Sequence, residues 1–256
     1  MFTKAIVRKP AANFAEGLTT VDFGVPDFQK TLDQHQKYCA ALEKCGLALT
    51  HLPADPRYPD STFVDDTAIL TEKGAILTHP GAASRAGETA DMQGTLLKLY
   101  PDLAEIRAPG TLDGGDICEA GTHFFIGISL RTNEAGGQQL ADWLKSKGYT
   151  ASFVDIRQTK GILHLKSGIS YIGENRLVVI DSLASHPDFK GYELVRMAPD
   201  EEYAANCIRV NDYILIAAGF PIFEATLRGL GYKLIVLDMS EYQKMDGGLS
   251  CLSLRF

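Results

Sequence analysis

Hydrophobic and polar positions follow one recurring order along the chain: a short apolar strand, a turn, an amphipathic helix and a second apolar strand. The order is clearest over 123–156 and 212–239, where the helix has apolar residues at 3.6-type spacing and ends at Gly-Tyr. A glycine directly after a helix is typical of a left-handed C-terminal cap. The same order recurs less sharply over 4–53, 67–109 and 168–197. The pattern therefore predicts five units of one type, each with a helix.

A short strand-like segment with polar or reactive side chains introduces each unit, although a strand in the core is expected to be apolar. Four of these segments precede a unit, and the fifth ends the chain. The fifth can introduce the first unit only if the two chain ends pair in space, as in radial folds that close on themselves. The segments are PDSTFVDD (59–66), LDGGDICEAG (112–121), ILHLKSG (162–168), YAANCIRV (203–210) and DGGLSCLSLRF (246–256).

This arrangement predicts an α/β fold in which residues 1–256 form a single domain. We expect a five-bladed α/β-propeller of ββαβ-like units with pseudo-fivefold symmetry, closed by pairing of the two chain ends. A doubly wound sheet with generic alternation of strands and helices is the alternative.

Closure of the ring would bring the polar side chains of the five segments to one axis. A thiol, an imidazole and carboxylates in one cleft are the parts of an activated cysteine nucleophile. Two alternatives stay open: the imidazole could be a hydrogen-bonded core histidine, and the carboxylates could hold divalent metal ions, which would leave the thiol unused. The converging side chains would be those of Asp60, Asp65, Asp66, Asp113, Asp116, His164, Asn206, Asp246 and Cys251.

Two Gly-Gly pairs lie beside these candidates. Gly114-Gly115 follows Asp113, and Gly247-Gly248 precedes Cys251. Glycine suits tight turns and positive φ, so both pairs predict turns that aim a neighbouring side chain.

The overall charge narrows the class of partner. The chain has 25 Lys and Arg against 32 Asp and Glu, a net charge of −7, which disfavours nucleic acid and anionic membranes as partners. No signal peptide and no apolar run of about 20 residues is present, so we expect a cytoplasmic protein. The five cysteines are scattered without a CxxC pair, which predicts free thiols.

Carboxylates around a nucleophilic thiol would repel its thiolate form, so the substrate is expected to carry a positive charge. A planar guanidinium is the cation that pairs bidentately with carboxylates. The pattern therefore favours a guanidine as the substrate.

The same segments resemble those of the dimethylarginine dimethylaminohydrolase family, in the guanidine-modifying (pentein) superfamily of five-bladed α/β-propellers. The resemblance runs from end to end. Its motifs are GLTT, PDSTFVDDTAIL, HPGAASRAGET, APGTLDGGDIC, RTNEAG, LHLKSG, YAANCI and KMDGGLSCLSLRF.

The resemblance implies a role for each matching residue. Cys251 would be the nucleophile, His164 the general acid and base, and Asp113 the acid that orients His164. The family usually has Glu where this chain has Asp65, and the shorter side chain would change the fit around the N-methyl groups. The implied substrate contacts are Leu18, Asp60, Asp65, Asp66, Arg85, Arg131 and Met245.

The implied activity is hydrolysis of asymmetric dimethylarginine and monomethylarginine to citrulline plus dimethylamine or methylamine. The reaction would pass through a covalent thiouronium on Cys251 and would use no metal and no organic cofactor. A deiminase of free arginine or another guanidine is one alternative, and a non-catalytic pentein binding module is another. The expected partners are a small guanidino substrate and a second copy of the chain in a homodimer, with no nucleic acid and no membrane.

Overall fold

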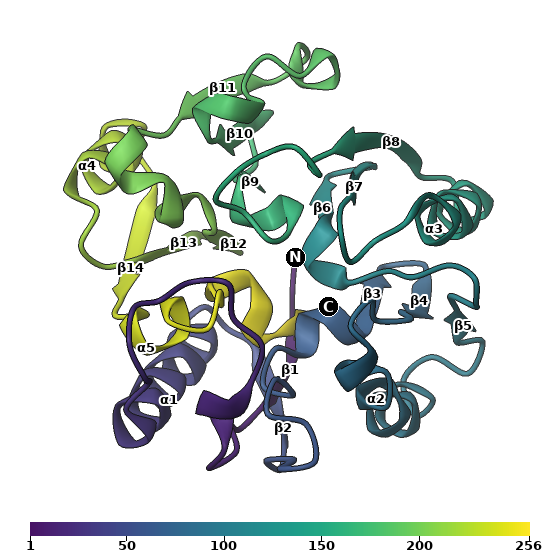
Figure 1. Ribbon diagram of the computed structural model, residues 1–256. Helices are drawn as coiled ribbons and strands as arrows, with labels where there is room; N and C mark the ends of the chain where they lie inside the picture. The colour runs from purple at the N-terminus through teal and green to yellow at the C-terminus, as the bar shows by residue number, and fades with distance from the viewer.

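The computed structural model describes all 256 residues and has five three-stranded sheets arranged in a ring, with both chain ends near its centre (Figure 1). In every sheet the first strand is antiparallel to the second, and the third is parallel to the second. The five-bladed ring predicted from the sequence is confirmed. The blades are β15 (Leu254–Arg255), β1 (Lys4–Arg8) and β2 (Ala48–Leu52); β3 (Ala68–Thr71), β4 (Gly74–Leu77) and β5 (Ala104–Glu105); β6 (Ile117–Ala120), β7 (His123–Ile128) and β8 (Thr150–Asp155); β9 (Ile169–Tyr171), β10 (Arg176–Val179) and β11 (Glu193–Arg196); and β12 (Ile208–Val210), β13 (Tyr213–Ala217) and β14 (Lys233–Leu237).

An α-helix connects the second strand to the third in four of the blades. Asp27 and Asn133 cap the first and third of these helices, because each side chain accepts a hydrogen bond of 2.8 Å from a first-turn backbone N–H. Gly148 and Gly231 follow two of the helices with φ of 78° and 87°, as the sequence predicts. The helices are α1 (Phe28–Lys44), α2 (Glu88–Leu96), α3 (Glu134–Ser146) and α4 (Pro221–Gly229), and a short α5 (Ser240–Gln243) precedes the closing segment.

The fourth blade has no α-helix, so the helix predicted within 168–197 is wrong. Two 3-10 helices, η6 (Asp181–Leu183) and η7 (Pro187–Phe189), take its place. Pro187 lacks a backbone N–H and restricts the residue before it, which interrupts a longer helix at this point.

Each introducing segment contains part of a 3-10 helix and a strand follows that helix, so the prediction that the segments are strand-like is wrong for the part before the strand. Their polar side chains lie on or next to these turns, before the strand enters the core. The turn η2 contacts both η9 and η4, η4 contacts η5, and η5 contacts η8, so the turns form an inner layer. They are η2 (Val64–Thr67), η4 (Gly114–Asp116), η5 (Leu165–Ser167), η8 (Pro199–Ala205) and η9 (Leu249–Leu252).

The two chain ends close the ring. β15 pairs with β1 in antiparallel register, with Leu254 opposite Ile6, and the backbone N–H of Phe256 donates to Lys4 at 2.9 Å. Ile6, Val64 and Leu254 belong to one buried apolar cluster that spans the first two blades. The closure therefore combines sheet hydrogen bonds with apolar burial and completes the first blade with the last strand of the chain.

Replacement of Leu254 tests the closure. Leu254 is 4% exposed, so we expect Leu254→Ala to lower the free energy of unfolding by about 2–4 kcal/mol, because it leaves a cavity between the chain ends. Leu97 is 47% exposed, and Leu97→Ala is the matched control, expected to stay within about 0.5 kcal/mol of the parent protein. Urea denaturation measures both. Equal losses in the two variants would contradict a closure that depends on this contact.

Candidate active site

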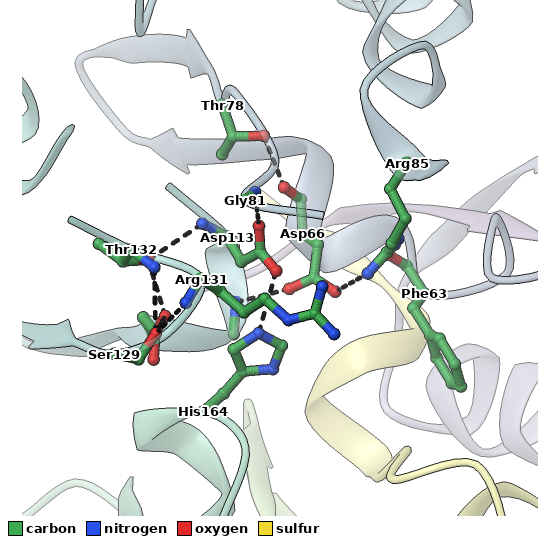
Figure 2. A network of polar contacts seen from close by, with 12 residues as sticks. Phe63, Asp66, Thr78, Gly81, Arg85, Asp113, Ser129, Arg131, Thr132 and His164 are labelled. Atoms are coloured by element: carbon green, nitrogen blue, oxygen red, sulfur yellow. Dashed lines mark hydrogen bonds and ion pairs between the residues drawn. The ribbon is translucent and has the colours of Figure 1, made fainter. Parts of the chain in front are cut away.

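His164 and Asp113 form a hydrogen-bonded pair between the third and fourth blades (Figure 2). Nε2 of His164 lies 3.1 Å from Oδ2 of Asp113, and Oδ1 of Asp113 accepts a hydrogen bond of 2.8 Å from the backbone N–H of Gly81. Both side chains are buried, and the second ring nitrogen of His164 has no hydrogen-bond partner in the protein. An acid that orients a histidine while leaving its other nitrogen free is the arrangement that general acid–base catalysis uses.

Gly114 and Gly115 let neighbouring groups approach closely. A Cβ at Gly115 would lie 2.6 Å from Nδ1 of His164, and one at Gly114 would lie 1.9 Å from the backbone oxygen of Asp65. Neither glycine has a positive φ, so positive φ as the reason for this Gly-Gly pair is wrong. Any side chain at either position would displace the imidazole or separate η4 from η2.

Asp66 and His164 carry opposite charges at neutral pH. Burial disfavours the charged carboxylate, but Arg85 and His164 outweigh it and lower the pKa of Asp66 to about 2. Burial also disfavours the imidazolium, but Asp66, Asp116 and Asp113 outweigh it and raise the pKa of His164 to about 9. Oδ2 of Asp66 accepts from Arg85 at 2.6 Å and Oδ1 from the backbone N–H of Gly115 at 2.8 Å. Protonated His164 therefore holds a proton that it can donate.

Cys251 lies on η9 and is the one cysteine that is partly exposed, whereas the other four are buried. Desolvation raises the pKa of its thiol to about 11, and the negative charges of Asp66 and Asp65 add to the effect. The thiol is therefore protonated at neutral pH until a positive charge arrives.

The backbone before Cys251 is fixed by contact with the fifth blade. A Cβ at Gly248 would lie 2.5 Å from Cγ of Asn206, and Oδ1 of Asn206 accepts a hydrogen bond of 2.9 Å from the backbone N–H of Ser250. Gly247 and Gly248 also lack positive φ, whereas Asp246 has φ of 55°. Asn206 thus positions the turn that carries Cys251, although Asn206 itself does not line the pocket.

One small pocket brings together the predicted site residues except Asp65, Asp116 and Asn206, and the expectation that these three converge on it is wrong. Its volume is about 30 Å³, room for about two water molecules, so an amino acid can enter only if the pocket opens. The segment around Leu18 is attached at this pocket, since the backbone N–H of Leu18 donates to both oxygens of Asp60 at 3.1 Å. The lining residues are Leu18, Asp60, Phe63, Asp66, Arg85, Asp113, Arg131, Leu163, His164, Met245, Asp246, Gly247 and Cys251.

Two arginines line the pocket, and they differ in their ion-pair partners. Arg85 is buried and pairs with Asp66 and, bidentately at 2.9 and 2.8 Å, with Glu88. Arg131 has no carboxylate partner, and its side chain extends across the space beside Asp66 and His164 in Figure 2. Arg131 is therefore the cation available to an incoming anion. Sequence reasoning missed Glu88, although its position three residues after Arg85 on a helical turn is a signal for such a pair.

Asp65 does not lie in this pocket. Its carboxylate forms an ion pair with Lys166, and both residues line a separate cavity of about 490 Å³. Successive side chains of the 3-10 helix η2 diverge, so Asp65 and Asp66 face different cavities. The expected placement of Asp65 in one pocket with Asp66 is therefore wrong. The effect of its shorter side chain on the fit of N-methyl groups stays a prediction.

Three groups of the pocket are close enough to share a metal ion. One ligand atom from each of Asp66, Asp113 and His164 lies within 4.8 Å of the others. These atoms already bond to one another or to Arg85 and backbone N–H groups, and none is left as an unsatisfied buried atom. A metal ion bound through Nε2 of His164 would have to replace the hydrogen bond to Asp113, and one bound to Asp66 would compete with Arg85 and the backbone N–H of Gly115.

Comparison with known proteins gives close relatives over the whole length. The chain is 43% identical to N(G),N(G)-dimethylarginine dimethylaminohydrolase of Pseudomonas aeruginosa, covering 100% of both chains, and 32% identical to that of Streptomyces coelicolor, covering 98% and 96%. The crystal structure of a cysteine-to-serine mutant of the Pseudomonas aeruginosa enzyme complexed with citrulline superimposes with a TM-score of 0.97 at 42% identity and full coverage of both chains. No family model matches the chain. At this identity and coverage, the chain belongs to the dimethylarginine dimethylaminohydrolase family.

Proposed function

We propose that the protein hydrolyses Nω-methylated arginines, asymmetric dimethylarginine and monomethylarginine, to citrulline and dimethylamine or methylamine. One observation carries the proposal: the only cysteine that is not fully buried shares a pocket with a buried His–Asp pair and two buried carboxylates, in a chain of this family. The small guanidino substrate expected from the sequence fits the same observation.

The substrate guanidinium binds between Asp66 and Asp60. Each carboxylate keeps acceptor capacity after the hydrogen bonds it makes within the protein, and a planar cation can use it. The substrate carboxylate pairs with Arg131, while Arg85 has one donor left after its bonds to Asp66, Glu88 and the backbone oxygen of Phe63. Leu18 and Met245 line the same pocket and contact the substrate there.

The guanidinium charge lowers the pKa of the Cys251 thiol, whose value of about 11 in the free protein otherwise keeps it protonated. The thiolate adds to the guanidine carbon and His164 protonates the departing amine, which leaves a thiouronium on Cys251. Neutral His164 then takes a proton from water as the water attacks the same carbon. The sulfur–carbon bond breaks, citrulline is released, and Cys251 takes the second proton of that water to become a thiol again.

Other expectations from the sequence stay predictions. We propose that residues 1–256 act as one catalytic domain, which the pairing of β1 with β15 supports, since it makes both chain ends part of one blade. The homodimer and the cytoplasmic location also stay predictions. No helix of the protein has the length and apolar character needed to cross a membrane.

Replacement of the nucleophile is the direct test. Cys251→Ser should lower the production of citrulline and dimethylamine from asymmetric dimethylarginine by at least about a thousandfold, because a serine hydroxyl is a much weaker nucleophile than a cysteine thiolate at neutral pH. Cys118→Ser, at a buried cysteine outside the pocket, is the control and should retain turnover. Arginine and monomethylarginine are assayed in parallel, and each assay is repeated with added EDTA.

Full activity in Cys251→Ser would refute the assignment of the nucleophile. Citrulline from arginine but not from methylated arginines would identify a deiminase instead. If EDTA abolishes the activity and a divalent metal restores it, the carboxylates hold a metal ion that the reaction needs.

Alkylation of Cys251 tests whether the free thiol is protonated. With a pKa of about 11, the rate of reaction with iodoacetamide should rise about tenfold per pH unit between about pH 7 and pH 9, without levelling off. Peptide mass mapping follows Cys251, with buried Cys118 as the unreactive reference. A rate that reaches a plateau below about pH 8 would show that the thiolate forms without the substrate.

A further inference from the structure

Asp116 is a buried carboxylate that forms hydrogen bonds with three residues next to the site. It lies on η4, is fully buried, and does not line the pocket. Its Oδ2 accepts hydrogen bonds from the hydroxyls of Ser129 at 2.6 Å and Thr132 at 2.7 Å. Its Oδ1 accepts from the backbone N–H of Leu165 at 3.0 Å. Three donors from two other segments thus converge on one side chain.

Each of these bonds leads directly to a residue of the site. Leu165 follows His164 in the chain. The Thr132 hydroxyl oxygen accepts from the backbone N–H of Asp113 at 3.1 Å, and that of Ser129 accepts from the backbone N–H of Arg131 at 2.9 Å. The bonds around Ser129, Thr132, Arg131 and Asp113 are visible in Figure 2. Asp116 is therefore linked to the imidazole, to its orienting acid and to the free arginine.

The chemistry of this arrangement requires a carboxylate. The hydroxyls of Ser129 and Thr132 donate hydrogen bonds to Asp116. Their lone pairs therefore point toward the backbone N–H groups of Arg131 and Asp113. An asparagine has only one acceptor oxygen, so its amide group would face either the N–H of Leu165 or both hydroxyl protons. In either orientation a buried donor would lose its acceptor.

The surroundings leave room for this one geometry. A Cβ at Gly127 would lie 3.0 Å from Oδ1 of Asp116 and 2.8 Å from Cβ of Leu165. Burial raises the pKa of Asp116, while His164 and the hydroxyls of Ser129 and Thr132 act in the opposite direction. A buried acid without these donors would be strongly disfavoured in its charged form.

We propose that Asp116 is a positioning residue, which holds the His164–Asp113 pair and the segment of Arg131 at the spacing that one substrate molecule requires. It does so without contact to the substrate. The inference rests on the proposed function, because it assigns leaving-group chemistry to the pair and carboxylate binding to Arg131.

Three variants test separately the hydrogen bonds that connect Asp116 to Arg131 and to Asp113. Ser129→Ala removes the acceptor of the backbone N–H groups of Arg131 and Thr132, and it should raise KM for asymmetric dimethylarginine about tenfold with kcat within about twofold. Thr132→Val removes the acceptor for Asp113 and should lower kcat about tenfold with a smaller change in KM. Asp116→Asn should do both. Purified folded protein is used, and thermal melting is recorded for each variant.

Glu201→Gln is the matched control. Glu201 is also buried and on a 3-10 helix, and it accepts from the backbone N–H groups of Ile222 and Phe223 at 3.0 and 2.6 Å, away from the pocket. It should lower the melting temperature while kcat and KM stay unchanged. If Asp116→Asn behaves in the same way, Asp116 is only structural and the proposal is overturned.

A measurement without turnover keeps the two proposals separate. The Nε2 proton of His164, followed by NMR in protein labelled with 15N-histidine, reports the bond to Asp113. Its resonance should shift or disappear in Asp116→Asn and stay in Glu201→Gln. An unchanged resonance in Asp116→Asn overturns the positioning role, whereas an inactive parent protein with the expected shift refutes the proposed function alone.

Discussion

The pairing of β15 with β1 is the contact on which the site depends. Cys251 lies on η9, three residues before the start of β15, and η9 packs against η2, which carries Asp66. A chain end without this pairing would be mobile, and the thiol would have no fixed place relative to the other groups. Closure of the fold and placement of the candidate nucleophile are therefore one event.

Around that fixed thiol, charges alternate through direct contacts. Glu88 pairs with Arg85, Arg85 with Asp66, and Asp113 with His164. Each of these buried charges thus has a partner of opposite sign, which offsets the cost of its burial. Cys251 is left as the neutral member, and the nearby carboxylates hold it in that state. An arriving guanidinium supplies the missing positive charge, so a neutral ligand of similar shape would bind without forming the thiolate.

Much of this arrangement could be predicted from the sequence because its signals are local and repeated. Five introducing segments and five strand pairs predict the ring, and the polar groups on those segments predict the pocket. The rest depends on contacts that spacing alone does not specify. Pro187 replaces a predicted helix by two short turns, and a one-residue step along η2 sends Asp65 to Lys166 in the other cavity. Gly115 and Gly248 serve close approach to His164 and Asn206, partners that only the folded ring reveals.

The repeated turn also explains why partners come from neighbouring blades. Asp113 and His164 hold the same position, immediately before η4 and η5, and they bond across the boundary between two blades. Asp116, three residues further along η4, crosses the same boundary to the backbone of Leu165. The first contact orients a side chain and the second holds the backbone that carries it, and both come from one turn of the DGGD segment. A shift between these blades would strain both contacts together, so the geometry of the pair is only as precise as the packing of η4 against η5.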